Sequence, residues 1–378
     1  LVNHMISQSV KASASDIHIV PSRDSLKIRY RIDGVLYDLF EPPKWIQSSL
    51  ITRIKVMADM DIAEKRLPQD SRIDVRIGNR DIDIRISTIP TTFGERVVLR
   101  LLDKSSSFLA LSQFGIDPDT LELIRQLSRQ TSGILLVTGP TGSGKTTTLY
   151  AMLSEINTSD INIITVEDPV EYKLEGISQI QVNTKTGLTF ARGLRSIVRQ
   201  DPDVILIGEI RDRETAEIAT QSALTGHLVF STLHTNDSAS AITRLSDIGI
   251  EPYLITSSVN AVVAQRLVRV LCPHCKEPYK PDPTTLESIN FERIGTETIF
   301  RANGCSNCFQ TGYRGRMPIF EILVCNNSIK GLILETTDAS KIKSAAVENG
   351  MTTLFADGVD KIIQGTTTIE EVLRVIHA

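Results

Sequence analysis

Hydrophobic and polar residues alternate with a period of two along much of the first hundred residues, which is typical of half-buried β-strands. The run 25–32 alternates in this way, and Asp33-Gly34 then supplies a hairpin turn into 35–37. Further strands are predicted at 72–77, 81–87 and 96–102, and helices at 2–11 and 45–60. This mixture predicts an N-terminal α+β domain over residues 1–104.

The pattern changes after this domain to helices that alternate with short apolar runs, at 134–138, 161–166, 203–207 and 228–233. Such an alternation predicts a parallel sheet covered by helices, an α/β domain that we place at 113–270. The serine-rich stretch before it predicts a linker at 105–112. A cysteine-bearing stretch follows at 271–315. The remainder, 316–378, is expected to be helical, with helices at 329–334, 341–348 and 369–376.

Composition narrows the classes of function. The chain has 378 residues, a net charge of −4 and 5% aromatic residues, so neither a basic surface nor a base-stacking surface for nucleic acid is indicated. No apolar run approaches the roughly 20 residues that a membrane-spanning helix needs. Because the chain begins at Leu1 rather than at an initiator methionine, we expect a further N-terminal region in the intact protein.

Residues 139–146 read GPTGSGKT, a full match to the phosphate-binding loop pattern, between an apolar strand and a predicted helix. The glycines let successive backbone N–H groups converge on an anion, and the helix N-terminus faces the phosphates. Lys145 is predicted to reach the β- and γ-phosphates and Thr146 to hold Mg²⁺. The predicted ATP-binding residues are Gly139, Pro140, Thr141, Gly142, Ser143, Gly144, Lys145, Thr146 and Thr147.

Three polar residues at predicted strand ends are candidates for catalysis. The apolar strand 203–207 leads to Glu209, and such a strand is expected beside the loop strand, with Glu209 on Mg²⁺ and on the attacking water. Glu167, at the end of another strand, is predicted to polarise the water; a helix or turn cap is the alternative. His234 ends a third strand and is a candidate γ-phosphate sensor, although a lone histidine is often structural.

Four cysteines form two C-x2-C pairs, Cys272/Cys275 and Cys305/Cys308, with 29 residues between the pairs. This spacing predicts a structural Zn²⁺ bound by four thiolates. Two disulfides are the alternative, but they require an oxidising compartment, and an ATP-dependent protein without a signal peptide is not expected in one. The fifth cysteine, Cys325, follows an apolar run and is expected to be a buried free thiol.

The motifs together resemble the secretion and type IV pilus ATPases, and among them the type II secretion ATPases, over essentially the whole chain. In the first domain the resemblance rests on SDIHI at 15–19, RIDG at 31–34, RIKVMA at 53–58 and GERVVLR at 94–100. In the second it rests on the phosphate loop, EDPVE at 167–171, IGE at 207–209, TGH at 225–227 and STLHTN at 231–236. The four-cysteine insert matches members that drive assembly.

The resemblance implies a RecA-like motor domain joined to a PAS-like N-terminal domain, assembled as a homo-hexamer. It implies that Arg85 and Arg100 of the N-terminal domain contact phosphate, and that Arg195 and Arg199 have similar roles. It implies a cytoplasmic ATPase, peripheral to the inner membrane through inner-membrane secretion-system proteins. These partners would bind mainly an N-terminal domain absent from this sequence.

Three alternatives to this function stay open at this point. A type IV pilus assembly ATPase would carry the same motifs and the same cysteine insert. A RecA-like nucleic-acid translocase would share the motor domain, although the acidic balance and low aromatic content count against it. A nucleotide-gated subunit that binds ATP without turnover is the third alternative, and the paired carboxylates Glu167 and Glu209 argue against it.

Overall fold

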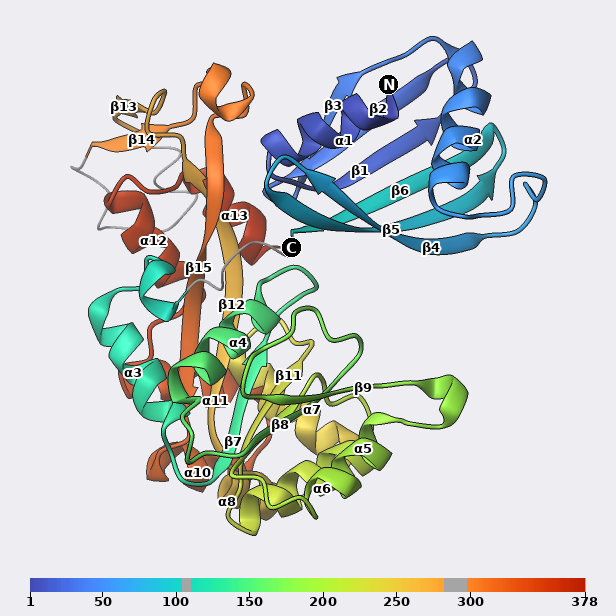
Figure 1. Ribbon diagram of the computed structural model, residues 1–378. Coiled ribbons are helices and arrows are strands. Elements are labelled where there is room, and N and C mark those ends of the chain that lie inside the picture. The colour runs from blue at the N-terminus through green and yellow to red at the C-terminus, as the bar shows by residue number, and fades with distance from the viewer. Residues whose placement is uncertain (104–109, 282–297, 378) are drawn as a thin grey trace. The chain divides into compact units, whose positions relative to one another are not determined.

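A computed structural model describes residues 1–103, 110–281 and 298–377 of the chain (Figure 1). These residues form two compact units. One comprises Leu1–Ser107 with Gly304–Gly315, and the other comprises Phe108–Asn303 with Arg316–Ala378. Most of the linker expected at 105–112 lies outside the described residues.

The first unit contains a six-stranded antiparallel sheet in the order β3-β2-β1-β6-β5-β4. Its strands are β1 (Ala14–Pro21), β2 (Leu26–Ile32), β3 (Val35–Phe40), β4 (Gln69–Ile77), β5 (Arg80–Thr91) and β6 (Gly94–Asp103). Helices α1 (Val2–Lys11) and α2 (Gln47–Met57) pack their apolar residues into one core with the sheet. The expected α+β domain, its helix at 2–11 and its alternating strands are therefore confirmed.

Charged side chains occupy the other face of this sheet. Asp16 of β1 stands between Arg31 of β2 and Arg100 of β6, and Arg100 stands opposite Arg85 of β5. Residues directly opposite one another in an antiparallel pair share a face. Asp16 accepts from Nε of Arg100 at 3.2 Å, while its other carboxylate oxygen lies 3.6 Å from Nε of Arg31. Arg85 and Arg100 are thus neighbours in a basic row that a single buried carboxylate helps to hold.

The second unit is built on a seven-stranded sheet in the order β15-β12-β7-β11-β10-β8-β9. Strand β7 lies between β12 and β11 and is entirely buried, and the pairings from β12 across to β9 are parallel. The strands are β7 (Gly133–Thr138), β8 (Ile163–Glu167), β9 (Ser178–Gln181), β10 (Val204–Ile207), β11 (Leu228–Leu233), β12 (Val259–Leu271) and β15 (Tyr313–Val324). The predicted α/β domain with a parallel sheet is confirmed.

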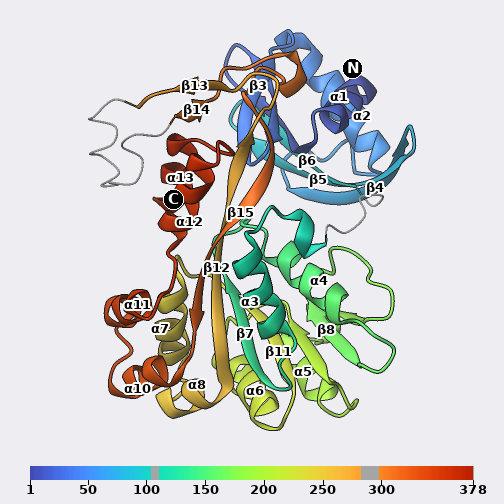
Figure 2. The ribbon, with the colours of Figure 1, turned by 90° about the vertical axis from the view of Figure 1, so that its left-hand side faces the viewer.

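Helices cover both faces of this sheet (Figure 2). One face packs against α3 (Pro118–Ser128) and α4 (Lys145–Ile156), and the other packs against α5 (Phe190–Ile197), α6 (Arg213–Leu224), α7 (Ser238–Ile248) and α8 (Pro252–Ser258). One expectation from the sequence is wrong. The strand that precedes Glu209, β10, does not lie beside the loop strand β7, because β11 is inserted between them.

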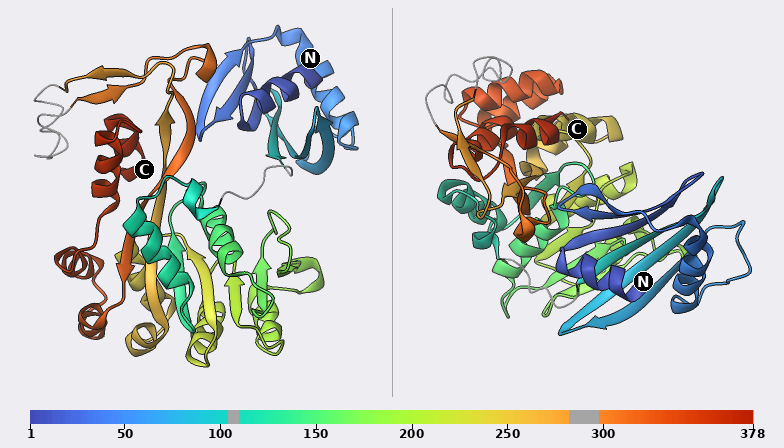
Figure 3. Two further views of the ribbon diagram at one scale, coloured as in Figure 1. Left: turned by 60° about the vertical axis from the view of Figure 1, so that its left-hand side comes forward. Right: turned by 90° about the horizontal axis from the view of Figure 1, so that it is seen from above.

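The last part of the chain begins as a strand and ends in four helices. Strand β15 runs along β12 and extends the large sheet (Figure 3). The helices are α10 (Asn327–Glu335), α11 (Ala339–Glu348), α12 (Leu354–Ile363) and α13 (Ile369–Ile376). The three predicted helices are confirmed and α12 is an addition to them. Within the cysteine-bearing stretch, β13 (Glu277–Tyr279) pairs with β14 (Ile299–Arg301).

A buried carboxylate holds helix α13 against strand β12. Glu371 is 1% exposed, pairs with Arg269 of β12 and accepts from Nε and Nη2 of Arg374 at 2.9 and 2.7 Å. Burial is the largest single influence and raises the pKa of Glu371. Its bonds to the two arginines outweigh burial and lower the pKa to about 2.

Replacing Glu371→Gln is expected to reduce the free energy of unfolding by about 2 kcal/mol at pH 7, allowing for the exposure of Arg374. The folded pKa lies below the ordinary value of 4.5, so the carboxylate stabilises the protein above pH 4.5 and loses this contribution as the pH falls toward 2. Urea unfolding at pH 7 and pH 4 measures the difference, which should shrink at the lower pH. The exposed neighbour Glu370→Gln is the control, and an equal effect of Glu371→Gln at both pH values would contradict the assignment.

Candidate nucleotide-binding and metal sites

The ends of four parallel strands bring most of the predicted site residues to one edge of the large sheet. In the order β7, β11, β10 and β8, these strands lead into the phosphate loop, His234, Glu209 and Glu167. Open α/β sheets bind ligands beyond the carboxyl ends of their strands. The residues predicted at strand ends therefore lie along one edge, and the contacts at that edge decide what each residue can do.

The phosphate loop joins buried strand β7 to helix α4, whose N-cap is Gly144 in the left-handed region with φ of 87°. Lys145 is buried, and its Nζ donates to the carbonyl oxygens of Gly139 and Pro140 at 2.7 and 3.1 Å. Burial lowers the pKa of Lys145 to about 8, Glu209 opposes that shift and Arg266 adds to it. Thr146 and Thr147 are exposed in the first turn of α4, where hydroxyl groups can reach a ligand.

The loop also lies tightly against β12. A Cβ placed on Gly139 would lie 2.5 Å from the carbonyl oxygen of Gln265 and 2.6 Å from Oγ of Ser143, so only glycine fits there. The Gln265 side chain donates from Nε2 to the carbonyl oxygen of Ser143 at 2.8 Å. The loop is thus shaped from behind by β12, while Thr141 and Gly142 stay exposed on its outer side.

Glu209 stands two residues beyond β10 between two positively chargeable groups. Its Oε2 lies 2.6 Å from Nε of Arg211 and 3.4 Å from Nε2 of His234. Its side chain is only 11% exposed. Its negative charge also reaches Lys145 and opposes the lowering of the lysine's pKa. The structure therefore brings together Glu209, His234 and the loop lysine.

Glu167 is placed differently. It is 3% exposed and points toward α4, where Tyr150 donates its hydroxyl to Oε2. Its Oε1 accepts from Oγ1 of Thr165 at 2.6 Å and from Nε2 of Gln179 at 3.2 Å. These donors occupy both carboxylate oxygens, so in this arrangement Glu167 connects β8, β9 and the helix that follows the phosphate loop.

His234 is half exposed at the end of β11. Burial lowers its pKa, the charge on Lys145 lowers it further, and Glu209 opposes both. The imidazole is therefore neutral at neutral pH and can accept or donate a proton. The next residue fastens the strand end to the loop strand, because the backbone N–H of Thr235 donates to Oγ1 of Thr138 at 2.9 Å.

The predicted arginines fall into two sets. Arg195 and Arg199 lie on and just after α5, exposed, with Arg195 paired to Glu214 and Arg199 donating to the carbonyl oxygen of Arg195 at 2.5 Å. Arg85 and Arg100 belong to the basic row of the first unit described above. The catalytic roles of these four arginines stay predictions.

Three contacts at the site were not foreseen from the sequence. Of the three residues, Arg211 alone could have been suspected from the sequence, because it lies two residues after Glu209 in the same short segment. Tyr150 and Arg266 carry no motif of their own. They reach the site because α4 and β12 pack against it, which only the folded chain reveals.

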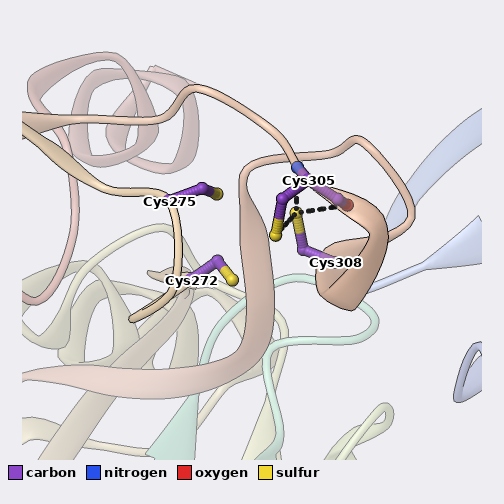
Figure 4. Close-up of side chains that lie close together, drawn as sticks. All are labelled: Cys272, Cys275, Cys305 and Cys308. Atoms are coloured by element: carbon purple, nitrogen blue, oxygen red, sulfur yellow. Dashed lines mark hydrogen bonds between the residues drawn. The ribbon is translucent and has the colours of Figure 1, made fainter.

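The four predicted cysteine ligands come together (Figure 4). The sulfur atoms of Cys272, Cys275, Cys305 and Cys308 all lie within 4.8 Å of one another, and all five cysteines of the chain are free thiols. Sγ of Cys305 and Sγ of Cys308 are 3.7 Å apart, close to the edge of about 3.8 Å in a zinc tetrathiolate tetrahedron.

Backbone groups support this cluster from behind. Sγ of Cys308 accepts from the backbone N–H of Cys305 at 3.1 Å and from that of Gly312 at 3.2 Å. Such N–H donors stabilise a thiolate and fix its direction toward a metal. The donor set and its supporting bonds fit a structural Zn²⁺. Cys325 is buried away from the cluster, as expected, and burial raises its pKa to about 12.

None of the helices within 1–103, 110–281 and 298–377 combines the length and the apolar character needed to cross a bilayer.

Comparison with known proteins gives one family. The family model described as "Type II/IV secretion system protein" matches residues 1–374. The chain is 53% identical over 375 residues to "Type II secretion system protein E" of Pseudomonas aeruginosa, covering 99% of this chain and 74% of that protein. It is 50% identical over 375 residues to "Type II secretion system ATPase E" of Vibrio cholerae serotype O1, with shares of 99% and 74%.

Among solved structures, the pilus retraction motor PilT with bound ADP is similar, with a TM-score of 0.64 and 28% identity. The match covers 98% of this chain and 96% of that one.

Proposed function

Because this chain belongs to the family of type II/IV secretion system proteins, we propose that it is an Mg-ATP-hydrolysing motor for type II protein secretion that drives pseudopilus assembly through domain motion. About half of its residues are identical to those of type II secretion proteins along nearly its whole length, which supports an ATPase function in type II secretion. The observation that carries the mechanism is the convergence of Lys145, Glu209 and His234 at the edge of the sheet. These groups support phosphoryl transfer to water at that edge.

Each residue then has a defined task. The loop N–H groups and Lys145 bind the phosphates of ATP, and Lys145 must turn from the loop carbonyls toward them. Glu209 orients the attacking water and accepts its proton, and His234 beside it responds to the γ-phosphate. Glu167, held by Tyr150 and Gln179, keeps β8 and α4 in register beneath the site.

Mg²⁺ would supply positive charge to the phosphate oxygens when it is bound with ATP. The residues that fit it are Thr146, whose hydroxyl is exposed in the first turn of α4, and the low-exposure carboxylate of Glu209. Four thiolates, those of the cysteine cluster, would hold Zn²⁺ in a structural site away from the chemistry.

Positive charge on the transferring phosphoryl group is proposed to come from Arg85 and Arg100, with Arg195 and Arg199 of the motor unit contributing. We propose a homo-hexamer in which these arginines act across subunit boundaries. The basic row on the first unit supports this idea, because Arg85 and Arg100 stand opposite each other on one face of the sheet and can approach a phosphate together. We propose further that the motor works at the cytoplasmic side of the inner membrane through a secretion-system partner there.

Mixing two inactive variants tests whether the arginines act between subunits. Arg100→Ala keeps the phosphate loop and Lys145→Ala keeps the arginine, so each homo-oligomer is expected to lack turnover. In a 1:1 mixed oligomer, half of the subunits have an intact loop, and half of their neighbours have an intact arginine. A site with both therefore forms in about one quarter of cases. About a quarter of wild-type phosphate release should return. No recovery would exclude action across subunits.

The control for this experiment is Arg76→Ala. Arg76 lies on β4 of the same sheet and its side chain is 75% exposed, so the change removes a surface arginine outside the row. This variant should retain turnover alone. If it is as inactive as Arg100→Ala, the loss reflects general damage to the first unit rather than a phosphate contact.

A further inference from the structure

Arg266 lies buried behind the phosphate loop although it belongs to no motif. It is 3% exposed on β12, the strand that pairs with the loop strand β7. Its Nη1 lies 3.1 Å from the position that a Cβ on Gly139 would take. Its charge also contributes to lowering the pKa of Lys145. The guanidinium is therefore close enough to sense what occupies the loop.

The hydrogen bonds of Arg266 join three separate segments. Nη1 donates to the carbonyl oxygen of Gln265 at 3.1 Å, and Nη2 donates to that of Asn236 at 2.7 Å. Nε donates to the carbonyl oxygen of Val375 at 3.2 Å, in the last turn of α13. A cation is stabilised at a helix C-terminus. One planar side chain thus bridges the loop that follows His234 and the final helix of the chain.

All three acceptors are neutral carbonyl groups. Within the part of the chain that the structure describes, no carboxylate forms an ion pair with Arg266; Asp237 and Glu321 act on it only through their fields. A buried guanidinium without a direct counter-charge is costly to desolvate, and burial accordingly lowers its pKa. A triphosphate bound in the phosphate loop would bring negative charge close to this guanidinium.

The segment between His234 and α7 gives this arrangement a mechanical connection. Thr235 is fastened to the loop strand through Thr138, and the next residue supplies the carbonyl that Arg266 holds. A shift of His234 toward or away from a γ-phosphate therefore moves an acceptor of the guanidinium. Such a shift also affects Val375, because its carbonyl oxygen accepts from the same rigid guanidinium group.

We propose that Arg266 is a positioning residue that couples nucleotide occupancy of the phosphate loop to helix α13. The proposal rests on the proposed function, since it requires ATP in the loop. Phosphate charge stabilises the guanidinium in the geometry that also binds Asn236 and Val375, so nucleotide binding tightens the last turn of α13. By reciprocity, releasing α13 weakens the nucleotide.

Hydrogen exchange of the full chain with and without the slowly hydrolysed analogue AMP-PNP and Mg²⁺ tests this coupling. In the wild type, nucleotide should slow exchange both in α4, beside the loop, and in α13, the latter by about fivefold. Helix α10, which Arg266 does not contact, is the internal control and should not change. In Arg266→Lys, which keeps the charge but loses the planar fork, protection of α4 should persist while that of α13 disappears.

Arg269→Gln is the matched control variant. Arg269 also joins β12 to α13, through Glu371, whereas the bond to the carbonyl oxygen of Asn236 comes from Arg266. Its loss should speed exchange of α13 in both states and leave the slowing by nucleotide intact. If α4 is protected and α13 is not in the wild type, or if Arg266→Lys keeps the α13 response, the inference is wrong. If α4 itself is not protected, the proposed nucleotide site has failed instead.

Discussion

Replacing Glu209 with alanine is expected to reduce ATP turnover about 1,000-fold while ATP binding persists. The carboxylate has 11% side-chain exposure and lies 3.4 Å from Nε2 of His234, where a water attacking the γ-phosphate can be oriented and deprotonated. The phosphate-binding groups belong to a different segment, the loop and α4, and survive the change. A 1,000-fold loss corresponds to about 4 kcal/mol of transition-state stabilisation.

Steady-state phosphate release measures the loss, and titration with a fluorescent ATP analogue measures binding. Glu217→Ala is the control, because Glu217 is an exposed carboxylate on the neighbouring helix α6 whose partner is Arg213. That variant should hydrolyse ATP within about twofold of the wild-type rate. Turnover above a tenth of the wild-type rate in Glu209→Ala would show that another group activates the water, and Glu167 would be the next to replace.

Removing Glu209 also leaves Arg211 and His234 without their shared acceptor. Some increase in nucleotide affinity is therefore expected, because the phosphates then face less negative charge. Glu209→Gln keeps the shape of the side chain and separates this electrostatic effect from the loss of the base. Both variants should be equally slow if proton acceptance is what matters.

The parts of this molecule that were predictable from sequence are those in which local pattern decides the outcome. Alternation along 72–77 and 81–87 indicates strands because one face of the small sheet is buried and the other is charged. GPTGSGKT predicts its loop because few sequences permit a backbone to converge on phosphate. The cysteine spacing predicts the cluster because each C-x2-C pair places two sulfur atoms close together in a short turn.

The parts that could not be predicted depend on contacts between distant segments. Strand β12 reads VNAVVAQRLVRVL, a nearly continuous apolar run, and a strand buried on both faces shows no alternation that separates it from a helix. Arg266 was missed with it. The insertion of β11 between β7 and β10 is a matter of topology, and the donors around Glu167 come from α4, β8 and β9.

The second large effect concerns the cysteine cluster. Freshly purified protein should contain one equivalent of zinc, and Cys272→Ser should contain almost none, because a three-thiolate remnant binds far more weakly. Metal analysis after gel filtration measures this directly. Apparent binding energies of structural zinc sites are about 10–16 kcal/mol, so the loss is expected to unfold the segment that the metal closes.

The shortness of the described elements in that segment explains why a metal would matter for its stability. The two cysteine pairs are separated by 29 residues, and the described elements between them are only the short strands β13 and β14. A two-stranded ribbon of this length is marginal without a staple. Zinc removes much of the loop-closure entropy of the unfolded segment, and so adds to the packing of the buried Ile299 in the core with α12 and α13.

Cys325→Ala provides the matched control for the cysteine experiment. It removes a buried thiol of the same chain that lies outside the four-sulfur cluster, so zinc content should stay at one equivalent. In thermal unfolding, Cys272→Ser should lower the temperature of the first transition. Cys325→Ala should lower it only by the modest cost of a small cavity. Less than about half an equivalent of zinc in the wild type would sink the four-thiolate assignment. Equal zinc loss in both variants would show that the metal depends on general folding rather than on Cys272, because Cys325 is also buried but lies outside the four-sulfur cluster.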